Sequence, residues 1–344
     1  MRNKVEFGLP PDVLFLNPWR DPGFKLLLEP EFIWRPMPRA RIEGFAVSAF
    51  GRVNQKINAC LKSTKQQKTF SHAIEYNAVP VVLDSVGFRK SYVMARDRMI
   101  LSGASATRLL NKYRWECAEA GCDGDVRLDG FFRACRDYND GKDVPVYSGL
   151  LEPDIDFAVE CRNTFNYYHF ITESLSQLTL LDGLDFQGNI YFHFPNQEEK
   201  QRPFAQAFVT ALFPELEGRV FFERAPKDYK RVLTAYDLIG SHPLMPEQDV
   251  EGIEKHATGD MAGERGLSDV RFHATLAMNS VSSTVLALRA RALRAVEGGD
   301  FSHLPRRFYV GRDTRQSRSR HMEGEDLLFD HLKLFGFEYV VFEN

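Results

Sequence analysis

The sequence predicts an α/β fold, with a parallel sheet in the region that begins near residue 156 and a β-rich region before it. Beyond residue 155, short apolar segments alternate with amphipathic segments, which is typical of a Rossmann-like parallel sheet covered by helices on both faces. Before residue 155, prolines and β-branched residues favour extended structure instead. The chain has 344 residues, which is long for one core, so we expect more than one domain.

The N-terminal region begins with a proline-rich segment. Seven prolines within residues 1–45 exclude long helices, and the aromatic residues there, Trp19 and Trp34 among them, predict an extended arm held against the rest of the protein. Two strands are expected at 79–83 and 91–94, separated by a turn at 84–87. A helix, a polar loop and a further strand complete this region at residues 107–120, 137–142 and 144–147.

The following region supplies the predicted parallel sheet. A helix capped by Asn163 or Thr164 and ending near Leu181 is its most distinctive element. The strands are expected at residues 157–160, 188–194, 219–222 and 231–236, and the other helices at 204–212 and 283–297. Residues 244–271 contain a proline, acidic residues and four glycines, and predict a surface excursion.

The glycines at the end of the helix at 283–297 predict a domain boundary near residue 300. We therefore expect three regions: 1–155, 156–300 and 301–344. The last would hold one βαβ unit, with strands at 307–310 and 339–342 and a helix at 323–334. One such unit is too small for a doubly wound domain, so we expect this second Rossmann-like domain to be incomplete. Its last strand would be covered by the N-terminal arm, a partner chain or a second copy in a homo-oligomer.

The composition and charge of the chain argue against several classes of protein function. The net charge of −3 gives no general attraction to nucleic acid. No apolar run reaches the 18 residues of a transmembrane segment and no N-terminal signal is evident, so a cytoplasmic location is expected. The five irregularly spaced cysteines argue against a disulfide framework. Cys117, Cys122 and Cys135 could bind a metal, but no histidine lies near them, and reduced, packed thiols are the favoured interpretation.

The segment Asn166-Tyr-Tyr-His-Phe-Ile-Thr-Glu-Ser-Leu175 carries the strongest candidate for chemistry. At about 100° per residue, one helix face would carry Asn166, His169, Glu173 and Ser176, and the opposite face Tyr168, Ile171, Leu175 and Leu178. Imidazole and carboxylate four residues apart can form an acid–base pair. The same spacing also fits an ordinary solvated pair on a surface helix.

This segment resembles the Asn-x-x-His-Trp-x-x-Glu-x-Leu-Pro-Arg signature of glycosyltransferase family 61, which includes bacterial capsular polysaccharide biosynthesis proteins. A second block, Phe308-Tyr-Val-Gly-Arg-Asp313 followed by Arg320-His-Met-Glu-Gly-Glu-Asp-Leu327, is similar to a later family block, and Gly336-Phe-Glu follows as in the family. The resemblance covers roughly residues 155–344. Phe170 replaces the usual Trp, Ser176-Gln177 replaces Pro-Arg, His321 replaces an Arg and Gly324 replaces an Asn.

The resemblance implies a GT-B-like architecture with acceptor and donor domains. It implies an inverting, metal-independent glycosyltransferase without a cofactor, moving a sugar from a nucleotide-sugar donor to a polysaccharide or lipid-linked glycan acceptor. His169 or Glu173 would act as the base. Asn166 and Tyr168 would bind substrate. Arg312, Arg320 and Glu325 would bind the nucleotide diphosphate.

Charge supports part of this assignment. Six arginines lie within residues 306–320, at a predicted strand-to-helix loop where phosphates commonly bind. The alternative is a solvated basic loop balanced by the acidic residues that follow. Two other functions remain open: a catalytically incomplete glycan-binding or scaffold protein that partners another transferase chain, and a metal-dependent hydrolase built on His169 and Glu173.

Overall fold

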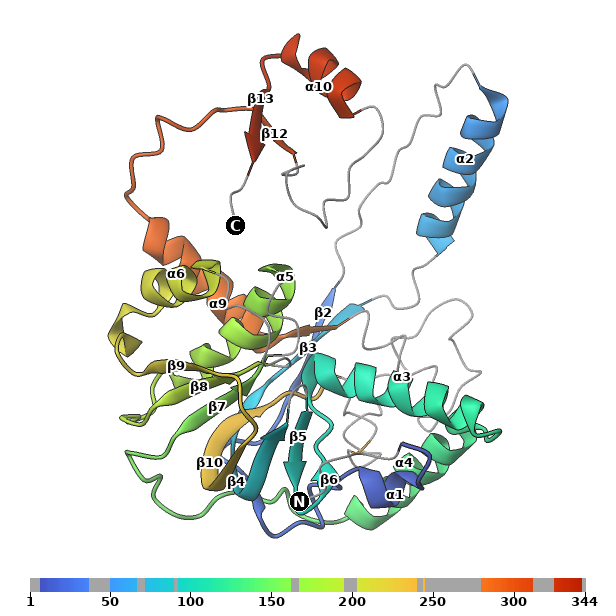
Figure 1. Cartoon of the computed structure of the whole chain (residues 1–344), viewed down its shortest axis with the longest axis vertical. Helices are drawn as coiled ribbons and strands as arrows, with labels where there is room; N and C mark the ends of the chain where they lie inside the picture. Colours follow the sequence, from blue (N-terminus) through green and yellow to red (C-terminus); the bar gives the residue numbers. More distant parts are fainter. Residues whose placement is uncertain are drawn as a thin grey trace.

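The computed structural model describes residues 7–36, 50–66, 72–89, 92–161, 167–194, 203–239, 244, 280–311 and 325–341. It is an α/β protein built around a mixed sheet that contains parallel strands (Figure 1). Eight described strands form this sheet, in the order β6-β5-β4-β10-β7-β8-β9 with β1 paired to β4. Their bounds are Phe24–Leu26 (β1), Val79–Arg89 (β4), Tyr92–Ala95 (β5), Arg98–Met99 (β6), Phe157–Glu160 (β7), Ile190–His193 (β8), Val220–Glu223 (β9) and Lys227–Tyr236 (β10).

The parallel part of the sheet consists of β10, β7, β8 and β9, as the alternating pattern beyond residue 155 predicts. The rest is antiparallel and comes from the N-terminal region. Nine residue pairs join β4 to β10, and β5 and β6 continue outward from β4. Strands from both sides of residue 155 therefore share one sheet.

The turn expected at residues 84–87 is wrong, because β4 is a single strand from Val79 to Arg89. Ser85 has a φ of 55°, which interrupts the pairing at one position. The register with β10 is the same on both sides, since Asp84 pairs with Arg231 and Val86 with Tyr229. The chain reverses between Arg89 and Tyr92 instead.

Successive residues of β7 point to opposite faces of the sheet and are buried in two different cores. This is expected of a strand that is buried on both faces. Phe157 and Val159 pack with Leu175, Leu178 and Phe204, on the face covered by the segment after β7 and by α6 (Pro203–Leu212). Ala158 packs in a second core, which includes Phe24, Val81 and Tyr236. Both faces of the parallel strands are thus covered.

Helices α1 (Pro11–Leu14), α3 (Gly103–Glu119) and α4 (Gly124–Asn139) contribute to a third core beside β5 and β6. Cys117 and Cys135 are buried in it as free thiols, which confirms that they pack as small apolar groups. Leu244, the described residue of the excursion expected at 244–271, is buried in the same core. The described helical elements also include α2 (Gly51–Gln66), η3 (Pro214–Leu216) and α9 (Ser283–Val296).

Two smaller sheets complete the described structure. The first joins β11 (Ser280–Ser282), β3 (His72–Tyr76) and β2 (Phe32–Pro36), so the N-terminal arm contributes strands as well as aromatic contacts. The second pairs β12 (Phe308–Gly311) with β13 (Glu338–Val341) in parallel, and α10 (Glu325–Lys333) lies between them in sequence. This confirms the expected βαβ unit, which Figure 1 shows beyond α9. The covering of its strand by another chain stays a prediction.

Among the helices of the described ranges, none combines the length and the apolar character that crossing a bilayer requires.

Candidate functional site

The site lies where β7 and β10 end and α3 begins. Gly103, the first residue of α3, donates its backbone N–H to the Asp237 carbonyl oxygen at 2.8 Å, and the Ser102 hydroxyl accepts from the Asp237 N–H at 2.9 Å. Gly103 has a φ of 54°, a conformation that glycine adopts without strain. The carboxyl ends of parallel strands are the usual place for ligand sites in α/β folds.

The segment after β7 is not the single α-helix that the sequence predicts. Its α-helical part, α5, spans Tyr167–His169, followed by a π-helix, η1 (Phe170–Ser174), and a 3₁₀ helix, η2 (Leu175–Leu181). The expected caps Asn163 and Thr164 lie outside the described residues. π turns are rare and often occur at functional sites.

Local side chains support this irregular backbone by bonding carbonyl oxygens that an α-helix would use. The Thr172 hydroxyl donates to the Tyr168 carbonyl, and the Ser176 hydroxyl to the Thr172 carbonyl, each at 2.8 Å. The Gln177 amide donates to the Glu173 carbonyl at 2.8 Å. Hydroxyl and amide side chains compete with regular helical bonding in this way.

The irregular helix changes the faces that the sequence predicts. Leu175 and Leu178 are fully buried, as expected. Tyr168, expected on the apolar face, is 65% exposed, whereas Ser176, expected on the polar face, is buried. The reason is that π and 3₁₀ turns hold different numbers of residues from an α turn, so a 100° period fails across them. Phe170 is buried against Phe192 and Phe204.

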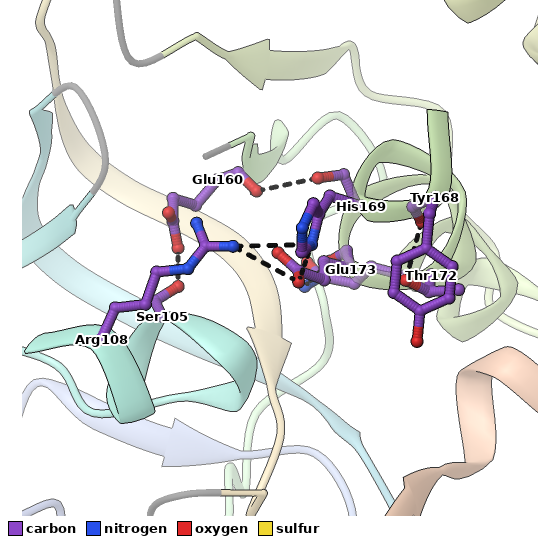
Figure 2. Close-up of polar contacts among 9 residues, drawn as sticks. Ser105, Arg108, Glu160, Tyr168, His169, Thr172 and Glu173 are labelled. Atoms are coloured by element: carbon purple, nitrogen blue, oxygen red, sulfur yellow. Dashed lines mark hydrogen bonds and ion pairs between the residues drawn. The ribbon is translucent and has the colours of Figure 1, made fainter. Parts of the chain in front are cut away.

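His169 and Glu173 nevertheless come together, as their spacing predicts. His169 Nδ1 lies 2.5 Å from Glu173 Oε1 (Figure 2). Arg108, from α3, approaches both residues, with Nη2 3.8 Å from Glu173 Oε1 and 3.5 Å from His169 Nδ1. The side chains of His169 and Glu173 are 26% and 20% exposed, so solvent screens them only in part. Three residues from three elements, α3, α5 and η1, form one charged cluster.

The cluster fixes the tautomer of a neutral His169. Because Nδ1 faces the Glu173 carboxylate, Nδ1 carries the proton and donates it, and Nε2 is then the basic nitrogen. The guanidinium of Arg108 balances the charge of Glu173. This arrangement can accept a proton at Nε2 and stabilise the resulting imidazolium.

A small cavity lies behind the cluster. It has a volume of about 40 Å³, and its polar lining comes from Ser105 of α3, Glu160 of β7, Glu173, Gln177 and Thr234 of β10. Small-molecule sites usually enclose at least about 300 Å³, so this cavity has room for water but not for a sugar ring.

Glu160 is the unexpected member of the site. Its Oε2 accepts a hydrogen bond from the Ser105 hydroxyl, and its buried Oε1 has no hydrogen-bond partner among the described residues (Figure 2). Burial, together with the charge of Glu173, raises the pKa of Glu160 to about 8, while Ser105 and Arg108 oppose that rise. Glu160 is therefore mostly a neutral acid at pH 7.

The structure describes only some of the other predicted site residues. Asn166, Arg312 and Arg320 lie outside the described residues. Glu325, expected to bind a diphosphate, is buried at the start of α10 and accepts a hydrogen bond from the Tyr309 hydroxyl at 3.0 Å. Tyr168 lies beside His169, with ring centroids 5.5 Å apart.

Arg108, Ser105 and Glu160 were missed by the sequence prediction. Arg108 and Ser105 lie about 60 residues before His169, in a helix without a motif, and Glu160 ends a strand that looks like ordinary core. Within the described part of the chain, no three His, Cys, Asp or Glu residues are grouped so that they could hold a metal ion.

Fold and site together describe an α/β protein with a partly buried Arg–His–Glu cluster at the carboxyl edge of its parallel strands. Comparisons with protein-family models, curated proteins and solved structures found no match to this chain.

Proposed function

We propose that this protein is an inverting glycosyltransferase of the family 61 type, with a GT-B-like arrangement, and that His169 is its catalytic base. The observation that carries the proposal is the 2.5 Å contact between His169 Nδ1 and Glu173 Oε1 beside Arg108. The resemblance of residues 166–175 to the family signature supplies the reaction class.

In the proposed reaction, His169 Nε2 takes the proton of an acceptor hydroxyl while that oxygen attacks the anomeric carbon of the donor sugar. The bond between that carbon and the nucleotide diphosphate breaks, and inversion follows from the single displacement. Glu173 orients the ring and stabilises the imidazolium, as a carboxylate does for a histidine base in other enzymes. Arg108 forms an ion pair with Glu173, with 3.8 Å between Nη2 and Oε1.

The acceptor would bind outside the cavity, because the cavity is too small for a sugar ring. The exposed ring of Tyr168, next to His169, offers an apolar surface for such a group. Arg312 and Arg320 remain the proposed residues for the donor diphosphate, on the strength of their charge and their place in the second family-like block.

The test is an assay of the full chain with a panel of labelled nucleotide sugars and oligosaccharide acceptors, in the presence of EDTA. The proposal predicts transfer that EDTA does not abolish, with inverted anomeric configuration in the product by NMR. Retention of configuration would contradict it. Binding of acceptor glycans without turnover of any donor would also contradict it and would favour the glycan-binding alternative.

A further inference from the structure

A second carboxyl group faces the same cavity as Glu173. Glu160 reaches it from the end of β7 and Glu173 from η1, so two acids from different elements line a space of about 40 Å³. Ionisation of both carboxyl groups around one small cavity is unfavourable, because the two negative charges repel each other. Arg108 is the guanidinium that acts on both.

The hydrogen bonds of the two acids differ. Glu173 Oε1 lies 2.5 Å from His169 Nδ1 and 3.8 Å from Arg108 Nη2, so two nitrogen groups face this oxygen. Glu160 has the Ser105 hydroxyl on Oε2 and no described donor on its buried Oε1. A buried carboxylate oxygen without a donor is costly, whereas a protonated oxygen can itself donate. The cavity also exceeds the 10–15 Å³ that one water needs, so a water can receive that hydrogen bond.

Other titratable groups surround Glu160. Cys161 follows it in the chain, His193 is its register partner on β8, and Tyr236 of β10 lines the cavity. Burial raises the pKa of Cys161 and lowers that of His193, so these two groups are neutral near pH 7. Asp237, buried beyond the end of β10, has a raised pKa for the same reason. The charges that decide the state of Glu160 are therefore those of Glu173 and Arg108.

We propose that Glu160 and Glu173 form a carboxyl pair that carries one proton between its two members, with Glu160 as the positioning residue that holds this proton next to the Arg108–His169–Glu173 cluster. This pair deepens the proposed function, because Glu173 is the partner of the catalytic base. Loss of the shared proton at alkaline pH would place two negative charges around one cavity and disturb the Arg108–His169–Glu173 cluster.

The direct test is a ¹³C NMR titration of the glutamate side-chain carboxyl groups in the full chain, with the Glu160 signal identified by its loss in Glu160→Gln. The pair predicts that Glu160 titrates at about pH 8. In Glu173→Gln its midpoint should move to lower pH by about one pH unit, the size expected of interacting acids. The matched control is Glu152→Gln, which alters an exposed partner of Arg231 and should leave the midpoint unchanged.

A Glu160 midpoint near the ordinary value for glutamate, about 4.3, would overturn the proposal. A raised Glu160 midpoint that is the same in the wild type and in Glu173→Gln would overturn the proposal too, because burial alone would then explain the titration. If Glu160→Gln does not fold, Ser105→Ala identifies the Glu160 signal instead. Loss of the Ser105 hydrogen bond should raise the midpoint of Glu160. If no glutamate midpoint changes in Ser105→Ala, the result counts against the pair.

This titration needs no substrate, so it is independent of the transferase proposal. If transfer is detected, the pair adds a kinetic prediction. The kcat/KM of the wild-type protein should fall above about pH 8 as Glu160 ionises, and this alkaline decline should be absent from the pH profile of Glu160→Gln. An alkaline decline that is the same in Glu160→Gln would exclude Glu160 as its source.

Discussion

His193 is a buried residue whose charge the fold strongly opposes. It stacks on Phe88 at 4.5 Å between ring centroids, and its Nε2 lies 2.8 Å from the Tyr229 hydroxyl. Burial lowers the pKa of His193 to about 3, and the positive charges of Lys227 and Arg89 add to the effect. The folded protein therefore keeps His193 neutral at a pH where an unfolded chain would protonate it.

This difference predicts a loss of stability in acid. As the pH falls from about 6.5 toward 3, the unfolded chain binds a proton that the folded protein excludes, so the free energy of unfolding decreases by about 1.4 kcal/mol for each pH unit. Urea unfolding at pH 7 and pH 5 should show a smaller decrease in His193→Gln than in the wild type. His303→Gln, at an exposed histidine, is the control, and an equal decrease in all three proteins would refute the assignment.

Glu160 predicts the opposite dependence. Its pKa is raised to about 8, mainly by burial, so the folded protein holds a proton that the unfolded chain releases above about pH 4.3. The stability that this proton contributes is present below pH 4.3 and is lost as the pH rises through 8. In Glu160→Gln the free energy of unfolding should therefore decrease less between pH 6 and pH 8.5. A parallel decrease in both proteins would show that Glu160 does not titrate in this range.

At the scale of elements, the irregular segment from α5 to η2 depends on its polar side chains. Ser176 is buried, donates to the Thr172 carbonyl and accepts from the Thr284 hydroxyl at 3.2 Å, and Thr284 in turn contacts Ser282 at 2.9 Å. These contacts join η2 to the start of α9. A buried polar group left without its partner costs about 1–3 kcal/mol.

Ser176→Ala should thus lower the free energy of unfolding by about 1–3 kcal/mol, as measured by urea titration, because it leaves the buried Thr284 hydroxyl and the Thr172 carbonyl without this partner. Ser148→Ala, at an exposed serine, should change it by less than about 0.5 kcal/mol. Equal effects of the two substitutions would mean that the hydroxyl network does not hold this segment.

The sequence predicted several regular elements beyond residue 155 but missed the irregular ones there, and it also missed the helices α2 and α4 of the N-terminal region. The helices at 204–212 and 283–297 were found to within a few residues, because regular helices show their period in the sequence. The π and 3₁₀ turns were missed, since hydroxyl-to-carbonyl bonds do not alter the hydrophobic pattern. The turn at 84–87 was wrong because Gly87 and Asp84 occur inside a strand, where Asp84 instead pairs with Arg231 at 2.8 Å.

At the scale of the whole molecule, β4 and β10 join the N-terminal region to the parallel strands. Their nine residue pairs bring Val82 and Leu233 into the core beneath the parallel strands. A fragment of residues 156–300 would lack β4 and expose the whole edge of β10. We expect this fragment to show no cooperative thermal transition by circular dichroism. A transition close to that of the full chain would mean that residues 156–300 fold independently.

The candidate site, too, could be predicted only in part from local sequence patterns. His169 and Glu173 could be paired from their spacing, because four residues bring two side chains together on almost any helical turn. Arg108 and Glu160 join them only through the tertiary fold, in which α3 begins against the end of β10. No spacing in the sequence predicts that contact.

We propose His169 as the catalytic base of a sugar transfer, and the most direct measurement of this role is the kcat/KM of His169→Gln with the donor and acceptor that the wild-type chain uses. His303→Gln is the matched control. We expect kcat/KM to decrease at least about 100-fold in His169→Gln, as for loss of a general base, and to stay unchanged in the control. A His169→Gln protein that is folded and retains wild-type kcat/KM would contradict the proposed role.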